Sequence, residues 1–142
     1  GPDEENIQDD LKSITSDCNS TILFVPYTTA PEDYFTASDI YCLPSYREGF
    51  GSTIIEAAAC GIPAIGSNIY GITDAIIDGE TGVLVEKGNV DALASAMLSL
   101  ANDPSVRKKM GESAKQRALE KFHQQRLSDE LMMVIKQQSD HL

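Results

Sequence analysis

The sequence predicts an α/β fold, a Rossmann-like, doubly wound parallel sheet of about four strands followed by C-terminal helices. Between Thr21 and Val85, short apolar runs alternate with helical patterns. The apolar runs are continuous rather than alternating, which is typical of strands that are covered on both faces. From Asn89 onward only helical patterns remain. These three observations together favour a parallel sheet with helices on both sides.

The first half of the chain supplies two of the strands. In order, we expect a helix at 4–16, a strand at 21–25, a short helix at 31–38, a strand at 40–43 and a helix at 52–60. Pro26 and Pro44 end the two strands, because proline cannot donate to a sheet ladder. Gly61 suits the position just after the helix, where a left-handed conformation is common.

The second half supplies two more strands and then the helices. We expect a strand at 63–66, a short helix at 72–77, a strand at 83–85, and helices beginning at 90, 104 and 124. Asn89 and Asp103 are N-cap residues, and Pro104 fits the first helical position. The helix from 90 shows a helical apolar period that predicts its buried face as Val90, Leu93, Met97 and Leu100.

Composition excludes several classes of function. The chain has 142 residues, the size of one domain, and a formal net charge of −11. That charge argues against nucleic acid as a partner and against docking of this segment on an anionic membrane. No apolar run reaches the roughly 18 residues of a membrane span. The N-terminus is acidic, unlike a signal peptide, so we expect a soluble, cytoplasmic chain.

Cysteine and histidine offer little for metal binding or for a catalytic triad. Cys18, Cys42 and Cys60 are odd in number and match no metal spacing, so we expect reduced thiols. The histidines, His123 and His141, both lie near the C-terminus. We therefore expect no metal site and no cofactor.

The segment from Ser45 to Ala57 carries the chemistry. It begins where a predicted strand ends, crosses a Gly-rich turn and enters a helix, which is where ligands bind in open α/β sheets. Gly49 and Gly51 lack a Cβ atom, so a ligand can approach their backbone N–H groups. Free N–H groups at the helix start favour an anion such as a diphosphate. Ser52 and Thr53 stand at that start.

Two glutamates complete the segment. Glu56 lies one turn into the helix, where a carboxylate can accept hydrogen bonds from a ribose diol. Glu48 lies on the turn, free to accept bonds from sugar hydroxyls. Each residue also has an interpretation that involves no ligand, since Gly-x-Gly alone is a weak signal and either glutamate could be an ordinary acidic residue of the surface. Ile54 occupies the third glycine position, so the dinucleotide fingerprint is incomplete.

Taken as a whole, the stretch from Pro44 to Pro63 resembles the signature of family 4 retaining glycosyltransferases, which have the two-domain GT-B fold. Glu48 and Glu56 have the family's spacing of Glu, seven residues, Glu, and the flanking Pro-Ser, Gly-Phe-Gly, Glu-Ala and Cys-Gly-x-Pro elements match. The resemblance covers about 31–131. It continues in four further places, namely Gly71, the Asp78-Gly79-x-Thr81-Gly82 turn, Asp91-Ala92-Leu93 and the Arg107-x-x-Met110-Gly111 helix.

The resemblance implies a role for each residue of the segment. Glu48 would be the catalytic residue and would hold the donor sugar, Glu56 would bind the ribose, and Pro26 and Tyr27 would lie near the base. The donor sugar and phosphates would be bound by Gly49, Phe50, Gly51, Ser52 and Thr53. Transfer would proceed with retention, without metal, by front-face attack in which the leaving diphosphate accepts the proton, so the main contribution of the protein is to stabilise that diphosphate.

The start of the chain departs from the family pattern. Family members carry an Arg and a Lys after the first strand of this domain, and no such unit precedes Glu4. We therefore interpret 1–142 as a partial C-terminal nucleotide-sugar-binding domain whose first two strands and acceptor domain are absent. The strand from Thr21 to Val25 would then be an orphan edge, paired beside 40–43 or with another chain in a dimer. Without the Arg/Lys pair, we expect no transferase activity from this chain alone.

Three other functions compete with a transferase. A nucleotide-sugar epimerase of the same fold also binds a UDP-sugar, and a non-catalytic nucleotide-binding module needs no second domain. A dehydrogenase is disfavoured by the broken glycine pattern. The two-glutamate spacing favours the transferase.

The resemblance also suggests the setting of the parent enzyme. We expect a UDP- or GDP-sugar donor, with UDP-hexose or UDP-N-acetylhexosamine favoured. The acceptor would be a glycan or lipid-linked sugar held by the missing domain. The enzyme would serve bacterial O-antigen (lipopolysaccharide) or other surface polysaccharide synthesis, at the inner membrane face.

Overall fold

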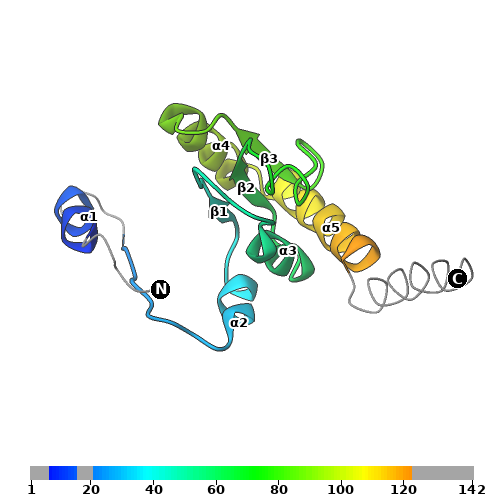
Figure 1. Cartoon of the computed structure of the whole chain (residues 1–142), viewed down its shortest axis with the longest axis horizontal. Helices are drawn as coiled ribbons and strands as arrows, with labels where there is room; N and C mark the ends of the chain where they lie inside the picture. Colours follow the sequence, from blue (N-terminus) through cyan, green and yellow to red (C-terminus); the bar gives the residue numbers. More distant parts are fainter. Residues whose placement is uncertain (1–6, 16–20, 123–142) are drawn as a thin grey trace, which may run out of the picture. The chain divides into compact units, whose positions relative to one another are not determined.

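The structure is a computed structural model that describes residues 7–15 and 21–122. The chain divides into two compact units, Gly1–Pro31 and Glu32–Leu142, and each is described by itself (Figure 1). The predicted last helix, at 124–138, and Cys18 lie outside the described residues.

The first unit contains one helix and an irregular segment. Helix α1 (Ile7–Thr15) confirms the helix predicted there, and the Lys12 ammonium lies 5.7 Å from the ring centroid of Phe24. The strand predicted from Thr21 to Val25 is wrong, because 21–30 form no regular structure. A strand needs a neighbour for its backbone N–H and C=O groups, and no described strand pairs with this segment. Its Leu23 side chain is exposed.

The rearrangement expected for that segment, pairing beside 40–43, is therefore not formed either. The sheet of the described residues contains only parallel pairs between β1, β2 and β3. Pairing of 21–25 with another chain stays a prediction.

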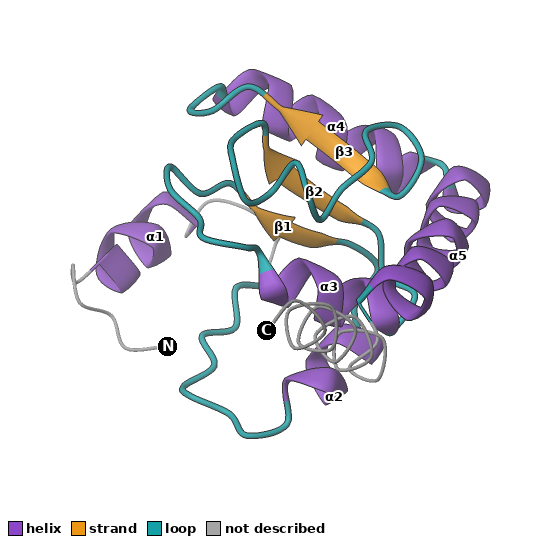
Figure 2. Cartoon of the chain, turned by 45° about the vertical axis from the view of Figure 1, so that its right-hand side comes forward, coloured by secondary structure: helices purple, strands orange, loops and turns teal. Residues whose placement is uncertain are grey.

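The second unit is built on a parallel sheet of three strands in the order β1-β2-β3, shown side by side in Figure 2. The strands are β1 (Tyr41–Leu43), β2 (Ala64–Ser67) and β3 (Gly82–Val85). They confirm the α/β class and the predicted strands at 40–43, 63–66 and 83–85 to within one residue. The sheet has three strands rather than the predicted four.

Helices cover both faces of this sheet. Helix α3 (Ser52–Ala59) packs through Ile54 against one face, together with Ile72 and Ile76. Helix α4 (Val90–Asn102) packs through Leu100 against the other face, where Ile65 is fully buried. Neighbouring strand residues alternate between the two clusters, as expected from a period of two.

Helix α5 (Pro104–Lys121) joins the two layers. It contributes Met110 to the α4 face and packs Ala114 and Ala118 against Ala58 of α3. Gly111 leaves no room for a side chain, because a Cβ atom there would collide with the backbone carbonyl of Gly61. The position therefore requires glycine.

Helix ends follow the sequence closely. Asn89 Oδ1 accepts from the amide of Ala92 at 2.9 Å, and Asp103 Oδ1 accepts from Ser105 and Val106 at 3.1 and 3.0 Å. Beyond α3, the Gly61 amide donates to Ala58 at 2.8 Å with a positive φ of 83°. Both predicted N-caps and the predicted glycine terminus are confirmed.

Two other predictions need correction. The buried face of α4 is formed by Ala92, Leu93, Ala96 and Leu100. Val90 is 74% exposed and Met97 is 44% exposed, because the small Ala92 and Ala96 bring the helix close to the sheet on a face rotated from the predicted one. The segment 72–77 forms consecutive turns rather than a helix, since the amides of Ile72 and Thr73 share the carbonyl of Ile69.

A short helix, α2 (Pro31–Thr36), precedes the sheet, as expected at 31–38. Its buried Phe35 makes an edge-to-face contact with Tyr41 of β1, with ring centroids 5.4 Å apart. None of the described helices is long and apolar enough to cross a membrane.

Candidate functional site at the β1–α3 turn

The turn between β1 and α3 lies at the carboxyl ends of the parallel strands, where ligands of open α/β sheets bind. Gly51 is the N-cap residue of α3 and adopts the left-handed conformation, with φ 62° and ψ 39°. No side chain caps the helix. The amide of Ile54 already donates to Gly51 at 2.9 Å, so the amides of Ser52 and Thr53 remain for a ligand or for water.

Glu48 is held in the middle of this turn. Its Oε1 accepts a hydrogen bond from the amide of Gly49 at 3.0 Å, and the side chain is half-buried. The carboxylate therefore lies against its own turn, with its second oxygen unbonded among the described residues. Such an oxygen can accept a bond from a ligand hydroxyl.

Gly71 supports the turn from the loop that follows β2. It has a positive φ of 86°, and a Cβ atom there would lie 2.6 Å from the carbonyl oxygen of Glu48 and 2.7 Å from that of Gly49. Its own carbonyl approaches Gly51 in turn. The three backbone segments are thus in direct contact, and the position of Glu48 depends on the absence of a side chain at Gly71.

A hydrogen bond also ties the start of α3 to the sheet. The Tyr41 hydroxyl donates to Thr53 Oγ1 at 2.8 Å, and the Tyr41 ring packs against Phe35. This bond fixes the position of the Thr53 hydroxyl, which still has its own O–H to donate, and leaves the Thr53 backbone amide free to face a ligand.

Glu56 stands on the solvent side of α3. Ser52 and Glu56 are both exposed and are four residues apart, so they lie on the same face of the helix. Ile54 and Ala57 are buried on the opposite face. A ligand that contacts the amides of the first turn could therefore also reach the Glu56 carboxylate.

Phe50 joins the turn to the far end of α5. Its ring is 52% exposed and makes an edge-to-face contact with Phe122, with centroids 5.9 Å apart. The Arg117 guanidinium lies 5.5 Å from the Phe122 ring centroid and donates to the carbonyl of Asp74 at 2.9 Å. The side chain of Phe50 is thus a packing group, and its backbone is the part placed on the turn.

Pro26 and Tyr27 belong to the first unit. Both are exposed, and Tyr27 is 81% exposed. Their assignment near a base stays a prediction.

Sequence reasoning found the turn but missed its supports. Tyr41 and Phe122 read as ordinary apolar residues, and only the structure brings them to the site. Gly71 belongs to the family resemblance, which gives it no role at the turn.

In the part of the chain that the structure describes, no three His, Cys, Asp or Glu side chains are grouped to hold a metal ion. Cys42 and Cys60 are free thiols, and burial raises the pKa of the Cys42 thiol above its ordinary value of 9.0. A raised pKa makes Cys42 a poor nucleophile at neutral pH.

Comparison with known proteins agrees with the geometry. The family described as Glycosyl transferases group 1 matches residues 3–117. The capsular polysaccharide biosynthesis glycosyltransferase CapM of Staphylococcus aureus is 33% identical over 127 residues, covering 89% of this chain and 33% of that protein.

Solved structures show the same fold. Sucrose-phosphate synthase from Thermosynechococcus elongatus superposes with a TM-score of 0.86 at 27% identity, covering 96% of this chain and 34% of that one. Anabaena HepE, solved in complex with UDP-glucose, has a TM-score of 0.84 at 19% identity, covering 95% of this chain and 38% of that one. The chain thus spans about a third of the length of these proteins.

Proposed function

The chain belongs to the group 1 glycosyl transferases, and from that premise we propose that its β1–α3 turn holds the nucleotide-diphosphate sugar donor of a glycosyltransferase. The observation that carries the proposal is the start of α3. Gly51 opens the helix in a left-handed conformation, no side chain caps it, and Glu56 stands one turn further on the exposed face. An uncapped helix N-terminus favours a diphosphate, and a carboxylate one turn away suits a ribose diol.

Each residue then has one task. The backbone of Gly49, Phe50 and Gly51 borders the donor sugar, and the amides of Ser52 and Thr53 donate to the phosphates. Glu56 accepts from the ribose, and Glu48 accepts from hydroxyls of the sugar that is transferred. Pro26 and Tyr27 lie near the base.

The chemistry we propose is transfer with retention of configuration at the sugar, of the family 4 type. The acceptor hydroxyl attacks from the face that the diphosphate leaves, the bond to the diphosphate breaks, and the acceptor proton passes to a leaving phosphate oxygen. The protein acts mainly by stabilising the charge that develops on the diphosphate. No metal or cofactor takes part in the proposal.

The likeness to HepE, solved with UDP-glucose, and to CapM, named for capsular polysaccharide biosynthesis, supports the choice of substrates. We propose a UDP-sugar, a UDP-hexose or UDP-N-acetylhexosamine, as the donor. The acceptor is a glycan or lipid-linked sugar of a surface polysaccharide such as O-antigen. The enzyme would work in the cytoplasm, at the inner membrane face.

We propose that this chain by itself shows no turnover, because it spans only about a third of the length of the glycosyltransferases that it matches. Mixing the pure chain with UDP-glucose and a panel of sugar acceptors, and measuring UDP release, tests this. UDP released above the rate of hydrolysis in buffer would contradict it.

The ribose contact can be tested without turnover. Calorimetry should show that the chain binds UDP more tightly than 2′-deoxy-UDP, by about tenfold, because one charge-assisted hydrogen bond is lost. Glu56→Gln should lower the affinity for UDP, so that UDP and 2′-deoxy-UDP bind with nearly equal affinity.

Glu112→Gln, a change at an exposed acid of α5, is the matched control and should keep the full preference. A preference for UDP over its deoxy form that survives Glu56→Gln would remove Glu56 from the ribose site.

A further inference from the structure

A hollow lies at the carboxyl edge of the same sheet, and the first residues of the β1–α3 turn form part of its wall. Its walls come from the residue after β1, the last residues of β2 and β3, and the start of α4. The residues used below are Pro44, Tyr46, Ser67, Val85, Glu86 and Asn89. Its volume is about 210 Å³. This is less than the roughly 300 to 1,000 Å³ of drug-sized sites, so the hollow suits one ring rather than a nucleotide.

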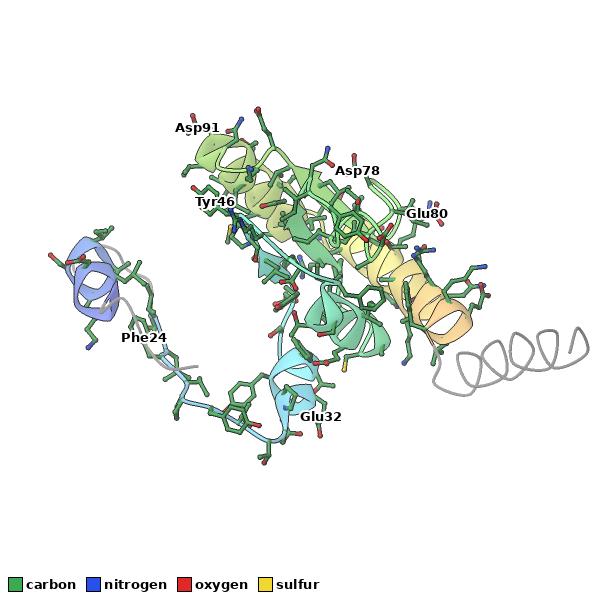
Figure 3. The ribbon with its side chains drawn as sticks, in the orientation of Figure 1. Phe24, Glu32, Tyr46, Asp78, Glu80 and Asp91 are labelled. Atoms are coloured by element: carbon green, nitrogen blue, oxygen red, sulfur yellow. The ribbon has the colours of Figure 1, made fainter. Side chains whose placement is uncertain are left out.

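The hollow lies on the opposite face of the sheet from α3. Val85 packs in the α4 cluster, and Ser67 shares the face of Ile65, two residues earlier in the same strand. Tyr46 stands at this end of the sheet, beside the start of α4 where Asp91 is labelled, and away from Asp78 and Glu80 (Figure 3). Tyr46 is also two residues before Glu48, so one loop borders both the hollow and the proposed donor site.

The aromatic wall is open to a ligand. The Tyr46 side chain is 70% exposed. Its ring lies against Gly88, where a Cβ atom would be 3.6 Å from Cε1 and 3.5 Å from the hydroxyl. An exposed ring held in this way offers an apolar face with a polar tip.

The hollow has few polar groups, and two of these, on Glu86 and Asn89, are held by hydrogen bonds. Ser67 is only 1% exposed, and its hydroxyl makes no hydrogen bond among the described residues. Glu86 Oε2 accepts from Asn89 Nδ2 at 3.3 Å, and Asn89 Oδ1 is held by the amide of Ala92. Apolar side chains form most of the remaining wall, including Pro44 and Val85.

No Lys or Arg lines the hollow, and Glu86 brings a negative charge. A phosphate or carboxylate would therefore be repelled. A neutral ring with hydroxyl groups fits, because its apolar face can lie on Tyr46 while its hydroxyls reach Glu86 and Ser67.

We propose that this hollow is a subsite for one neutral sugar ring of the acceptor, which places part of the acceptor on this chain and not only on the acceptor domain that the resemblance implies. The assignment to the acceptor rests on the proposed function, since the single sugar of the donor is placed at Glu48, which does not line the hollow. Tyr46 would then be the residue through which acceptor binding and the donor loop communicate.

The test is an amide NMR titration of the chain with methyl α-glucoside and, separately, with UDP and with inorganic phosphate. A single ring should bind weakly, with a Kd of about 1 to 100 mM. We expect the glucoside to shift the amides of Ser67, Gly88 and Asn89, and phosphate to leave them unchanged. Tyr46→Ala should weaken binding of the glucoside by about three- to tenfold. Tyr70→Ala, which removes another exposed tyrosine that does not line the hollow, should leave this binding unchanged.

Several results would overturn the subsite: no glucoside shifts in a folded chain, shifts confined to 48–53, or an equal loss in both tyrosine variants. The UDP titration tests the proposed donor site separately from the subsite. Glucoside shifts at the hollow without UDP shifts at Ser52 would refute the donor site and the acceptor assignment while leaving a sugar site. The reverse pattern would refute the subsite alone.

Discussion

Gly71 supports the turn of the candidate site from a separate loop, without being one of the proposed ligand-binding residues. Its backbone fills the space beneath the turn of Glu48 and Gly49, and its φ of 86° is one that other residues rarely adopt. The nearby Asp78-Gly79 turn provides a comparison, because Gly79 has a φ of 74° but nothing within 4 Å of the Cβ position.

Substituting the two glycines therefore distinguishes two effects of an added side chain: the strain of a positive φ, present at both positions, and a collision with neighbouring atoms, present only at Gly71. Gly79→Ala should cost about 1 to 2 kcal/mol of unfolding free energy, the penalty of the left-handed conformation alone. Gly71→Ala should cost at least about 1 kcal/mol more, since the carbonyls of Glu48 and Gly49 must also move. Urea unfolding measures both. Equal losses would show that the close packing of the turn contributes nothing to stability.

The role of Arg107 in the structure differs from the one that its sequence context suggests. In the cluster Arg107-Lys108-Lys109 it reads as part of a solvated basic face. In the structure its Nη1 donates to the carbonyl of Leu100 at 2.7 Å, and its Nη2 pairs with Asp39 at 3.1 Å. Arg107 thus donates to a backbone carbonyl at the end of α4 and links this helix to the segment before β1. Both contacts depend on the tertiary fold, so no local sequence pattern predicts them.

At the scale of elements, strong local signals predicted the structure best. Three strands and five described helices follow from apolar runs, caps and glycine stops, because each of these is decided within a few residues. The strand expected at 21–25 failed, since a strand depends on a partner that local sequence does not specify. The face of α4 failed for a similar reason: Ala92 and Ala96 pack more closely than the larger Val90 and Met97.

The cap between α4 and α5 gives a prediction at this scale. Asp103 Oδ1 accepts from two amides of the first turn of α5, so Asp103→Ala should lower the unfolding free energy by about 1 kcal/mol. Glu112→Ala, an exposed change within the same helix, should alter it by less than about 0.5 kcal/mol. Thermal unfolding monitored by circular dichroism compares them. A loss in Asp103→Ala no larger than the control would remove the cap from the account.

For the whole molecule, the sequence predicted the family, which is confirmed, and the turn that carries the candidate site, but not the residues that surround that turn. The residues from Glu48 to Glu56 are contiguous, so their spacing alone pointed to the turn. Its supports come from separate segments, Tyr41 on β1, Gly71 after β2 and Phe122 after α5, and only folding brings them together. The family match over residues 3–117 confirms the family, while the roles of the turn's residues stay a prediction.

The most direct test of the central claim, that the β1–α3 turn binds a nucleotide diphosphate, is to map the amide NMR shifts of this chain on titration with UDP, GDP and NAD. We predict shifts at Gly49, Gly51, Ser52 and Thr53 with UDP, weaker ones with GDP and none with NAD, and their loss in Glu56→Ala. Unchanged amides at 49–53 in millimolar UDP, or shifts of equal size in Glu56→Ala, would contradict the claim.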